Sequence, residues 1–146
     1  MGTENESLVL VLACAVEQAR KPRGLIAEQA GMHRQTLMAL IRGKRTVKLE
    51  DAARVLAACD VPVRSTLMLA LIGQEEFACQ WMHHEVGQFL DEFLTSLPSA
   101  LDDVLGDRRD EVRPRWARGT SQLVAKMLAN HIDDFAARDV GAGLVR

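Results

Sequence analysis

Residues 23–48 read RGLIAEQAGMHRQTLMALIRGKRTVK, and the rest of the chain is best understood around this stretch. Apolar residues recur at helical spacing on both sides of Gly31, which predicts two short helices joined by a tight turn. The segment from Arg20 to Lys48 holds eight basic residues and one acid, Glu28. Such a block of positive charge on a helical pair indicates a surface for an acidic partner.

The chain has 146 residues and a net charge of −2, with 48% hydrophobic and 26% charged residues. These values are typical of a globular protein with one ordinary domain, or a small domain and a helical accessory region. Residues 1–72 carry ten basic and seven acidic side chains, whereas residues 73–146 carry eight and thirteen. We therefore expect two regions with different partners, a domain over 1–73 and a helical region over 74–146.

The abundance of Ala, Leu, Arg and Glu favours an all-α fold. Ser7 is expected to cap the first helix, Pro98 to begin a new segment, and the tail from Asp139 to Arg146 to be frayed. Apolar periodicity and the Gly and Pro breaks predict helices over residues 7–20, 25–30, 33–42, 49–59, 65–72, 75–97, 100–105 and 110–138.

The central stretch meets the local requirements of a helix–turn–helix unit. Ala27 is small enough for the crossing of two helices, and Gly31 supplies a positive φ at low cost. Leu37 and Leu40 are spaced to face the core from the second helix. That helix is then free to enter a DNA major groove with its first turn against the base edges.

The run from Leu25 to Val61 resembles the Cro/CI-type (XRE-like) helix–turn–helix of prokaryotic and phage regulators. That family has a stretch of the form G-x-S-x-x-T-I-S-x-x-E-x-G-K-R, followed by a Leu-led helix that ends in Leu-Gly-Val. The resemblance covers residues 7–72 and implies a five-helix DNA-binding domain. His33 replaces the usual capping hydroxyl and Ile41 replaces the usual Glu. The matching positions are Gly31, Thr36, Leu37, Gly43, Lys44, Arg45, Leu49 and the closing Cys59-Asp60-Val61.

Side-chain chemistry divides such a domain into base readers and phosphate contacts. Arg suits guanine, Gln suits adenine, and small apolar groups suit the thymine methyl. The predicted base readers are His33, Arg34, Gln35, Thr36, Met38 and Ala39. The predicted phosphate contacts, which fix the register without reading sequence, are Arg23, Arg42, Lys44, Arg45 and Lys48. The alternative for this charge block is a solvated face without a partner.

Large apolar side chains recur at helical spacing through the second half of the chain. They are most simply core or a dimer seam, and a ligand pocket is the alternative. We expect the C-terminal helices to form a homodimer interface through Phe77, Trp81, Phe89, Phe93, Trp116, Leu123, Met127 and Phe135.

Other chemistry finds little support in the sequence. Cys79 and His83 are four residues apart beside His84, which is half a zinc site without a second pair, so we expect no metal. The acid pairs Asp102-Asp103 and Asp133-Asp134 lack a partnered His or a nucleophile. We therefore expect no enzyme activity and no cofactor.

The three cysteines are Cys14, Cys59 and Cys79. Their wide spacing and odd number predict no disulfide framework and favour the reducing cytoplasm. The N-terminal residues carry neither the pattern of a signal peptide nor that of a membrane span, so no membrane partner is expected.

These patterns give two hypotheses for function. The first is a sequence-specific transcriptional regulator, by default a repressor, that binds double-stranded DNA as a homodimer on a palindromic operator. Its acidic second half leaves open an activator that contacts RNA polymerase. The second hypothesis is a non-enzymatic protein–protein interaction module, such as an antitoxin-like or phage-encoded partner binder.

Overall fold

The computed structural model describes residues 3–144, and the side chains of residues 3–138. Every regular element within this range is helical, which confirms the predicted all-α class. The chain divides into two compact units, Met1–Ala100 (unit 1) and Leu101–Arg146 (unit 2). The sequence suggested a boundary at residues 73 and 74, but Ala78 and Met82 are buried in the core of unit 1. Within residues 3–144, no helix has both the length and the apolar composition that a membrane span requires.

Helix α1 (Glu4–Gln18) begins three residues earlier than the sequence predicted. Its N-cap is Thr3 rather than Ser7: the Thr3 hydroxyl accepts from the Glu6 backbone N–H at 3.2 Å, and the Glu6 carboxylate accepts from the Thr3 N–H at 3.3 Å. This reciprocal capping box satisfies two N–H groups that the first turn leaves without partners. Ser7 is instead buried within the helix.

Helices α2 (Arg23–Gln29) and α3 (Arg34–Ile41) form the predicted helical pair, and their bounds lie within two residues of prediction. Gly31 has a φ of 70° in the turn between them, a conformation that costs glycine little. Ala27 is buried at 1% exposure, and its carbonyl accepts from the Met32 N–H at 3.0 Å. This bond, together with that from the Gly31 N–H to the Glu28 carbonyl at 3.1 Å, closes the end of α2 in the manner of a helix that ends in a left-handed glycine.

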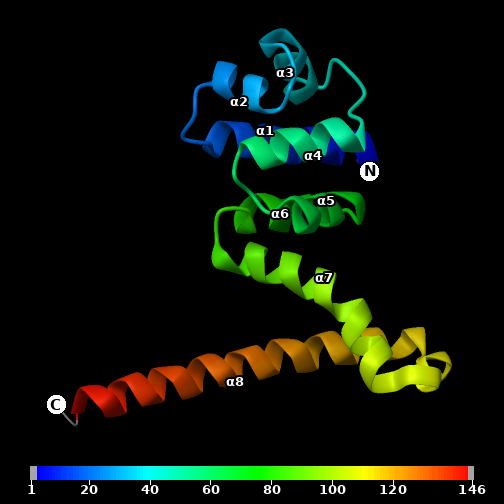
Figure 1. Cartoon of the computed structure of the whole chain (residues 1–146), viewed down its shortest axis with the longest axis vertical. Helices are drawn as coiled ribbons and strands as arrows, with labels where there is room; N and C mark the ends of the chain where they lie inside the picture. The colour runs from blue at the N-terminus through cyan, green and yellow to red at the C-terminus, as the bar shows by residue number, and fades with distance from the viewer. Residues whose placement is uncertain (1–2, 145–146) are drawn as a thin grey trace. The chain divides into compact units, whose positions relative to one another are not determined.

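Helices α4 (Leu49–Ala58) and α5 (Val63–Leu71) complete the predicted five-helix arrangement. In Figure 1, α1 and α4 form a middle layer of unit 1, with α2 and α3 on one side and α5 and α6 on the other. Leu49, the residue that leads α4, is exposed at the first position of that helix. The largest fully buried apolar side chains are Val11, Leu12, Ile26, Leu37, Leu40, Val55 and Leu56.

The prediction of one helix over residues 75–97 is wrong. Helix α6 (Glu75–Trp81) ends at a tight turn, and α7 (Glu85–Leu105) then begins. Within the turn the His84 N–H donates to the Trp81 carbonyl and the Gly87 N–H donates to the His84 carbonyl, both at 3.0 Å. The turn lets α6 bury Ala78, with Met82 at its end, while the only buried residue of α7 is Gly87.

Helix α7 packs on α5 through polar contacts at its first turns. The Ser65 hydroxyl donates to the Gly87 carbonyl at 3.0 Å, and the Ser65 N–H donates to the Asp91 carboxylate at 2.8 Å. Asp91 thus supplies a partner for the uncapped start of α5. The expected break at Pro98 is wrong as well, since this residue lies exposed inside α7. Its ring removes one backbone donor and crowds the carbonyl of Leu94, which favours a kink rather than the end of the helix. The predicted segment 100–105 is the end of the same helix.

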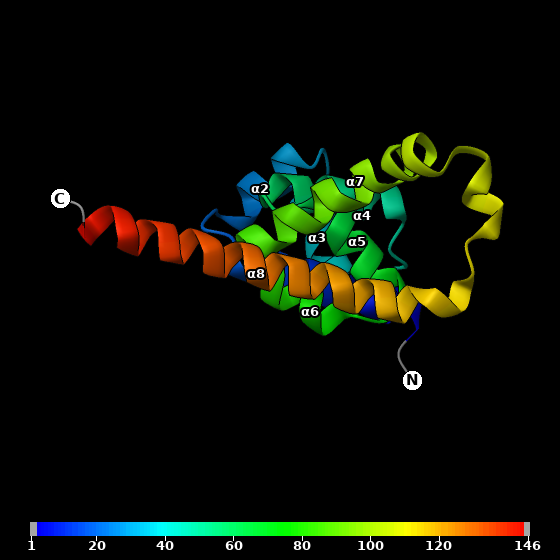
Figure 2. The ribbon, with the colours of Figure 1, turned by 90° about the horizontal axis from the view of Figure 1, so that it is seen from below.

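Unit 2 contains two short 3₁₀ segments, η1 (Gly106–Glu111) and η2 (Pro114–Trp116), followed by α8 (Ala117–Leu144). The yellow-to-red part of the ribbon in Figure 2 shows this succession. The last helix was expected from residue 110, but the chain before Pro114 is 3₁₀ or extended. The predicted frayed tail is helical as far as Leu144, and its last two residues lie outside the described range.

The cysteine prediction is also wrong. Cys14 on α1 and Cys79 on α6 form a disulfide with a Cα–Cα distance of 5.9 Å, although 65 residues separate them. Only the packing of α6 on α1 brings these two positions together, so their spacing in the sequence carried no sign of the bond. Cys59 remains a free, buried thiol.

Candidate nucleic-acid interface

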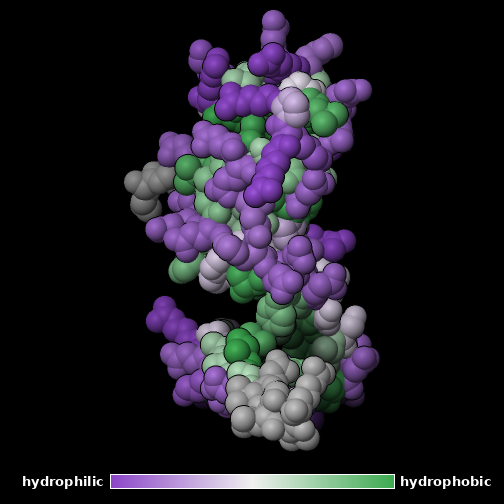
Figure 3. All heavy atoms as spheres, turned by 90° about the vertical axis from the view of Figure 1, so that its left-hand side faces the viewer, coloured by the Kyte–Doolittle hydropathy of each residue, from purple (hydrophilic) through white to green (hydrophobic). Residues whose placement is uncertain are grey.

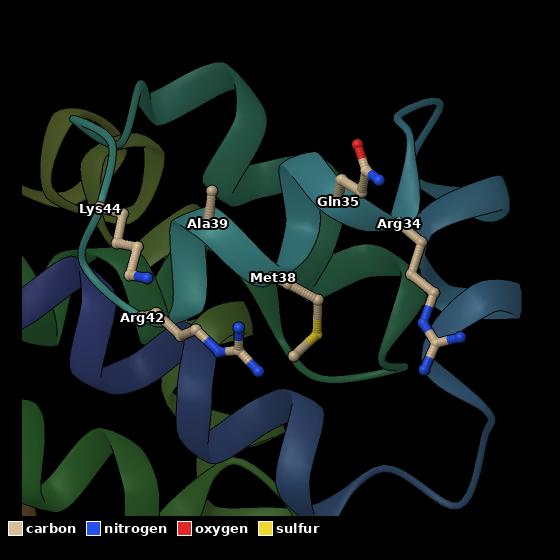
Figure 4. A pocket seen from close by; sticks show the side chains of 6 residues that line it. All are labelled: Arg34, Gln35, Met38, Ala39, Arg42 and Lys44. Carbon is tan, nitrogen blue, oxygen red and sulfur yellow. The ribbon is translucent and has the colours of Figure 1, made fainter.

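The outer face of α3 presents two rows of side chains. Arg34, Met38 and Arg42 recur every four residues and point to one edge, while Gln35 and Ala39 point to the other (Figure 4). The inward positions are taken by buried apolar residues, which fix the rotation of the helix. The helical period therefore separates the core-facing stripe from the stripe that carries most of the predicted base readers.

These five residues and Lys44 line an open surface depression of about 570 Å³. Arg34, Gln35, Arg42 and Lys44 are exposed, and Met38 and Ala39 are half-buried on the floor. The end of unit 1 formed by α2 and α3 is mostly hydrophilic, as Figure 3 shows. The mixture of cations, one amide and apolar groups suits the base edges and backbone of DNA.

The cations of this surface are not neutralised by the protein. Among the residues that the structure describes, no acidic side chain pairs with any of the cations Arg34, Arg42, Lys44, Arg45 and Lys48. By contrast, Arg54 on α4 pairs with Glu50 and Asp51 at 3.3 and 3.1 Å. The exposed cations near α3 therefore keep their full attraction for an anionic partner.

The start of α3 is open for hydrogen bonding. His33 occupies the N-cap position, is exposed, and makes no side-chain cap hydrogen bond, as expected from the missing hydroxyl. The N–H groups of the first turn are then available to an oxygen acceptor such as a phosphate. Thr36, another predicted base reader, is half-buried in this turn and does not line the depression.

Arg23 lies differently from the other predicted phosphate contacts. It is the first residue of α2, is half-buried, and its Nη1 donates to the Met38 sulfur at 3.7 Å. This contact ties the start of α2 to the middle of α3. It places a phosphate candidate beside a base-reading candidate, so the guanidinium also orients the Met38 side chain.

The loop between α3 and α4 carries Lys44, Arg45 and Lys48. Its backbone is anchored from a distant part of the chain, because the Asn5 side-chain oxygen on α1 accepts from the buried Val47 N–H at 2.7 Å. The bond holds the loop that bears the three cations against α1. Sequence reasoning missed Asn5, because no local motif links it to a loop 42 residues away.

Lys21 belongs to the basic block but has a structural position. Its Nζ donates to the Ala58 carbonyl and to the Gln29 side chain, each at 2.9 Å, and pairs with Asp60 at 2.9 Å. These contacts join the ends of α2 and α4. The charge of Lys21 is thus partly compensated within the protein, unlike that of the cations around α3.

The eight residues predicted for a dimer interface fall into two groups. Phe77 and Trp81 lie 4.9 Å apart between ring centroids on α6, and Phe89 and Phe93 lie 5.8 Å apart on α7, all in unit 1. Trp81 and Phe93 are half-buried, and the other two are exposed. The exposed members in unit 2 are Trp116, Leu123, Met127 and Phe135.

The half zinc site loses its thiol, because Cys79 is bonded to Cys14. Among the described residues, no cluster of three or more His, Cys, Asp or Glu side chains is placed to hold a metal ion.

Comparison with known proteins found no matching family model, no matching curated protein and no matching solved structure. The chemistry of the α3 surface itself is therefore the main evidence for function.

Proposed function

We propose that this chain is a sequence-specific DNA-binding transcriptional regulator of the Cro/CI-type helix–turn–helix class. The observation that supports this most directly is the exposed face of α3. There Arg34, Gln35 and Arg42 project beside apolar groups, with Lys44 adjacent, and the cations have no acidic partner in the described chain. Arg34 and Gln35 read bases, and the loop cations bind phosphates.

The regulator acts as a homodimer and represses by default. One recognition helix reads only a few base pairs, so two copies separated by one turn of DNA, about 34 Å, are needed for a selective site. A dimer seated on a promoter excludes polymerase, which makes repression the simplest outcome. The exposed apolar side chains of unit 2 favour a protein partner, and we propose a second copy of the chain.

The primary experiment selects genomic DNA fragments on the purified full-length protein and maps the bound site by footprinting. Binding is then measured by fluorescence anisotropy over a salt series. We expect a palindromic footprint and an affinity that falls steeply with salt, because bound cations release counterions from DNA. Salt-independent binding or the absence of any footprint would contradict the proposal.

Two variants separate base reading from phosphate binding. Arg34→Ala combined with Gln35→Ala should lower operator affinity while leaving affinity for unrelated DNA nearly unchanged, at about 1–3 kcal/mol for each lost base contact. Lys44→Ala should weaken both DNAs alike and reduce the salt slope by about 1. Lys126→Ala in α8 is the matched control and should change neither. Equal effects of the double variant on both DNAs would refute the base-reading role.

The dimer is tested by sedimentation of the wild-type protein across a concentration series. Leu123→Glu places a charge on the exposed apolar side of α8, and we expect it to shift the protein to monomer. Gln122→Glu, one position away, adds the same charge at a residue that is already polar and should leave the mass unchanged. A wild-type protein that remains monomeric at all concentrations would rule out the homodimer.

A further inference from the structure

The Cys14–Cys79 disulfide joins a long, capped and well-buried helix to a short helix without a side-chain cap. Helix α1 has fifteen residues, a capping box and six buried residues. Helix α6 has seven residues, no side-chain cap at Gln74, and one buried residue, Ala78. Helices this short are not stable alone, so α6 depends on its docking to α1 and α5.

The disulfide is accessible from the protein surface. Both cysteines are half-buried rather than enclosed, and Cys79 lines an open depression of about 670 Å³ together with Leu10, Gln18, Glu75, Glu76 and Gln80. Thiol–disulfide exchange requires a thiolate to reach one sulfur of the bond. The depression beside Cys79 therefore gives an attacking thiolate a route to the bond from the Cys79 side.

The third cysteine does not take part in exchange. Cys59 is 4% exposed, and burial raises the pKa of its thiol to about 11 from the ordinary value of 9.0. The nearby Lys21 charge opposes this rise and Asp60 adds to it. Because only the thiolate is nucleophilic, Cys59 stays inert near neutral pH and the pair opens and closes without rearrangement.

We propose that Cys14–Cys79 is a redox-sensitive latch that fixes α6 on α1 when oxidised and releases it when reduced. The reductant is a dithiol. Its thiolate attacks the Cys79 sulfur, the bond between the two cysteines breaks, and Cys14 leaves as a thiolate that takes up a proton. The second thiol of the reductant then displaces Cys79, so the reductant ends as a disulfide and the protein gains two thiols.

Release of α6 has a consequence for regulation that rests on the proposed function. Phe77 and Trp81 on α6 belong to the predicted dimer surface, whereas the α3 surface is held by other contacts, such as the bond from Asn5 to Val47. Reduction is therefore expected to weaken operator binding that depends on the dimer. The helical pair α2–α3 itself should stay folded.

The experiment compares the oxidised and reduced forms of the full-length wild-type protein by hydrogen–deuterium exchange under native conditions. After treatment with excess dithiothreitol and removal of the reagent without air, N-ethylmaleimide should label Cys14 and Cys79 but not Cys59. Backbone amides of α6 should exchange at least about tenfold faster than in the oxidised form, while those of α2 and α3 should be unchanged. Diamide should restore the slow exchange.

Two variants complete the test. Cys14→Ala combined with Cys79→Ala should show fast α6 exchange in both conditions, and Cys59→Ala should respond to reduction as the wild type does. A pair that stays closed in dithiothreitol, or an α6 whose exchange is the same in both forms, would overturn the latch. Operator affinity is measured separately: released α6 with unchanged affinity overturns the regulatory role, whereas absence of DNA binding in both forms refutes the proposed function and leaves the latch standing.

Discussion

The two units of this protein differ in what holds them together. In unit 1, six helices and the start of α7 surround one core, and buried hydrophobic residues run from Leu8 to Met82. In unit 2, no side chain between Leu101 and Arg138 is buried, and only three of these residues are even half-buried. Unit 1 therefore has tertiary support of its own, whereas α8 keeps its apolar residues on the surface.

The two units therefore present different kinds of surface to a partner. In unit 1 the buried Leu37 and Leu40 fix the rotation of α3, and so the side of the helix on which its polar side chains lie. A 28-residue helix with exposed Leu123, Met127, Ile132 and Phe135 presents apolar surface that water does not favour. The proposed homodimer would cover this apolar surface.

The loss of a large apolar side chain should destabilise unit 1 much more than unit 2. Leu56→Ala leaves a cavity in the core of unit 1 and should lower the free energy of unfolding by about 3–5 kcal/mol in urea denaturation. Leu123→Ala in α8 should change it by less than about 0.5 kcal/mol at concentrations where the chain is monomeric. Equal losses would mean that Leu123 is buried within the monomer.

A second test uses the buried thiol of unit 1. Below pH 9 the Cys59 thiol is protonated in the folded and the unfolded chain; between pH 9 and 11 it ionises only in the unfolded chain. Because the folded protein then binds the extra proton, stability should fall as pH rises through this window, by up to about 3 kcal/mol. Urea denaturation at pH 8 and pH 11 measures the loss. Cys59→Ala should remove this part of the slope, and an identical slope in that variant would contradict the shift.

A glycine in each unit should respond differently when it is replaced by alanine. A Cβ on Gly87 would collide with the Trp81 carbonyl oxygen, whereas a Cβ on Gly119 in α8 meets no atom within 4 Å. We expect Gly87→Ala to destabilise unit 1 by about 2 kcal/mol, because the turn into α7 must shift. Gly119→Ala should stabilise α8 by about 0.5–1 kcal/mol, seen as higher helicity by circular dichroism. A neutral result for Gly87→Ala would show that the turn yields easily, and a neutral result for Gly119→Ala would show that this position gains nothing from helix propensity.

A smaller loss of stability is expected when the loop between α3 and α4 loses its hydrogen bond to Asn5. Asn5→Ala leaves the Val47 N–H without its partner and should cost about 1 kcal/mol of stability. It should also weaken binding to all DNA sequences alike, because the loop cations are less well placed. Anisotropy titrations measure this, with Asn130→Ala, an exposed position of α8, as the control. A selective loss of operator binding would instead indicate that Asn5 acts through the predicted base readers Arg34 and Gln35.

Local chemistry was enough to predict the five N-terminal helices. The period of the apolar residues, the breaks at Gly31 and Gly43 and the small Ala27 all act over a few residues. The backbone adopts the expected positive φ at Gly31, and a positive φ is found at Gly43 as well. The helical spacing of Leu37 and Leu40 likewise predicted which side of α3 faces the core. It also contained the Thr3–Glu6 capping box, a local signal that the choice of Ser7 overlooked.

Features that depend on distant contacts were decided only by the tertiary structure. The turn after Trp81, the Asn5 bond to Val47 and the Cys14–Cys79 disulfide each join residues that have no local reason to meet. The helical class and the outward-facing polar residues of α3 followed from the sequence, because periodicity and side-chain chemistry are properties of single segments. Only packing decided where α6 reverses and which cysteines pair, because those outcomes depend on how much apolar surface two separated helices bury together.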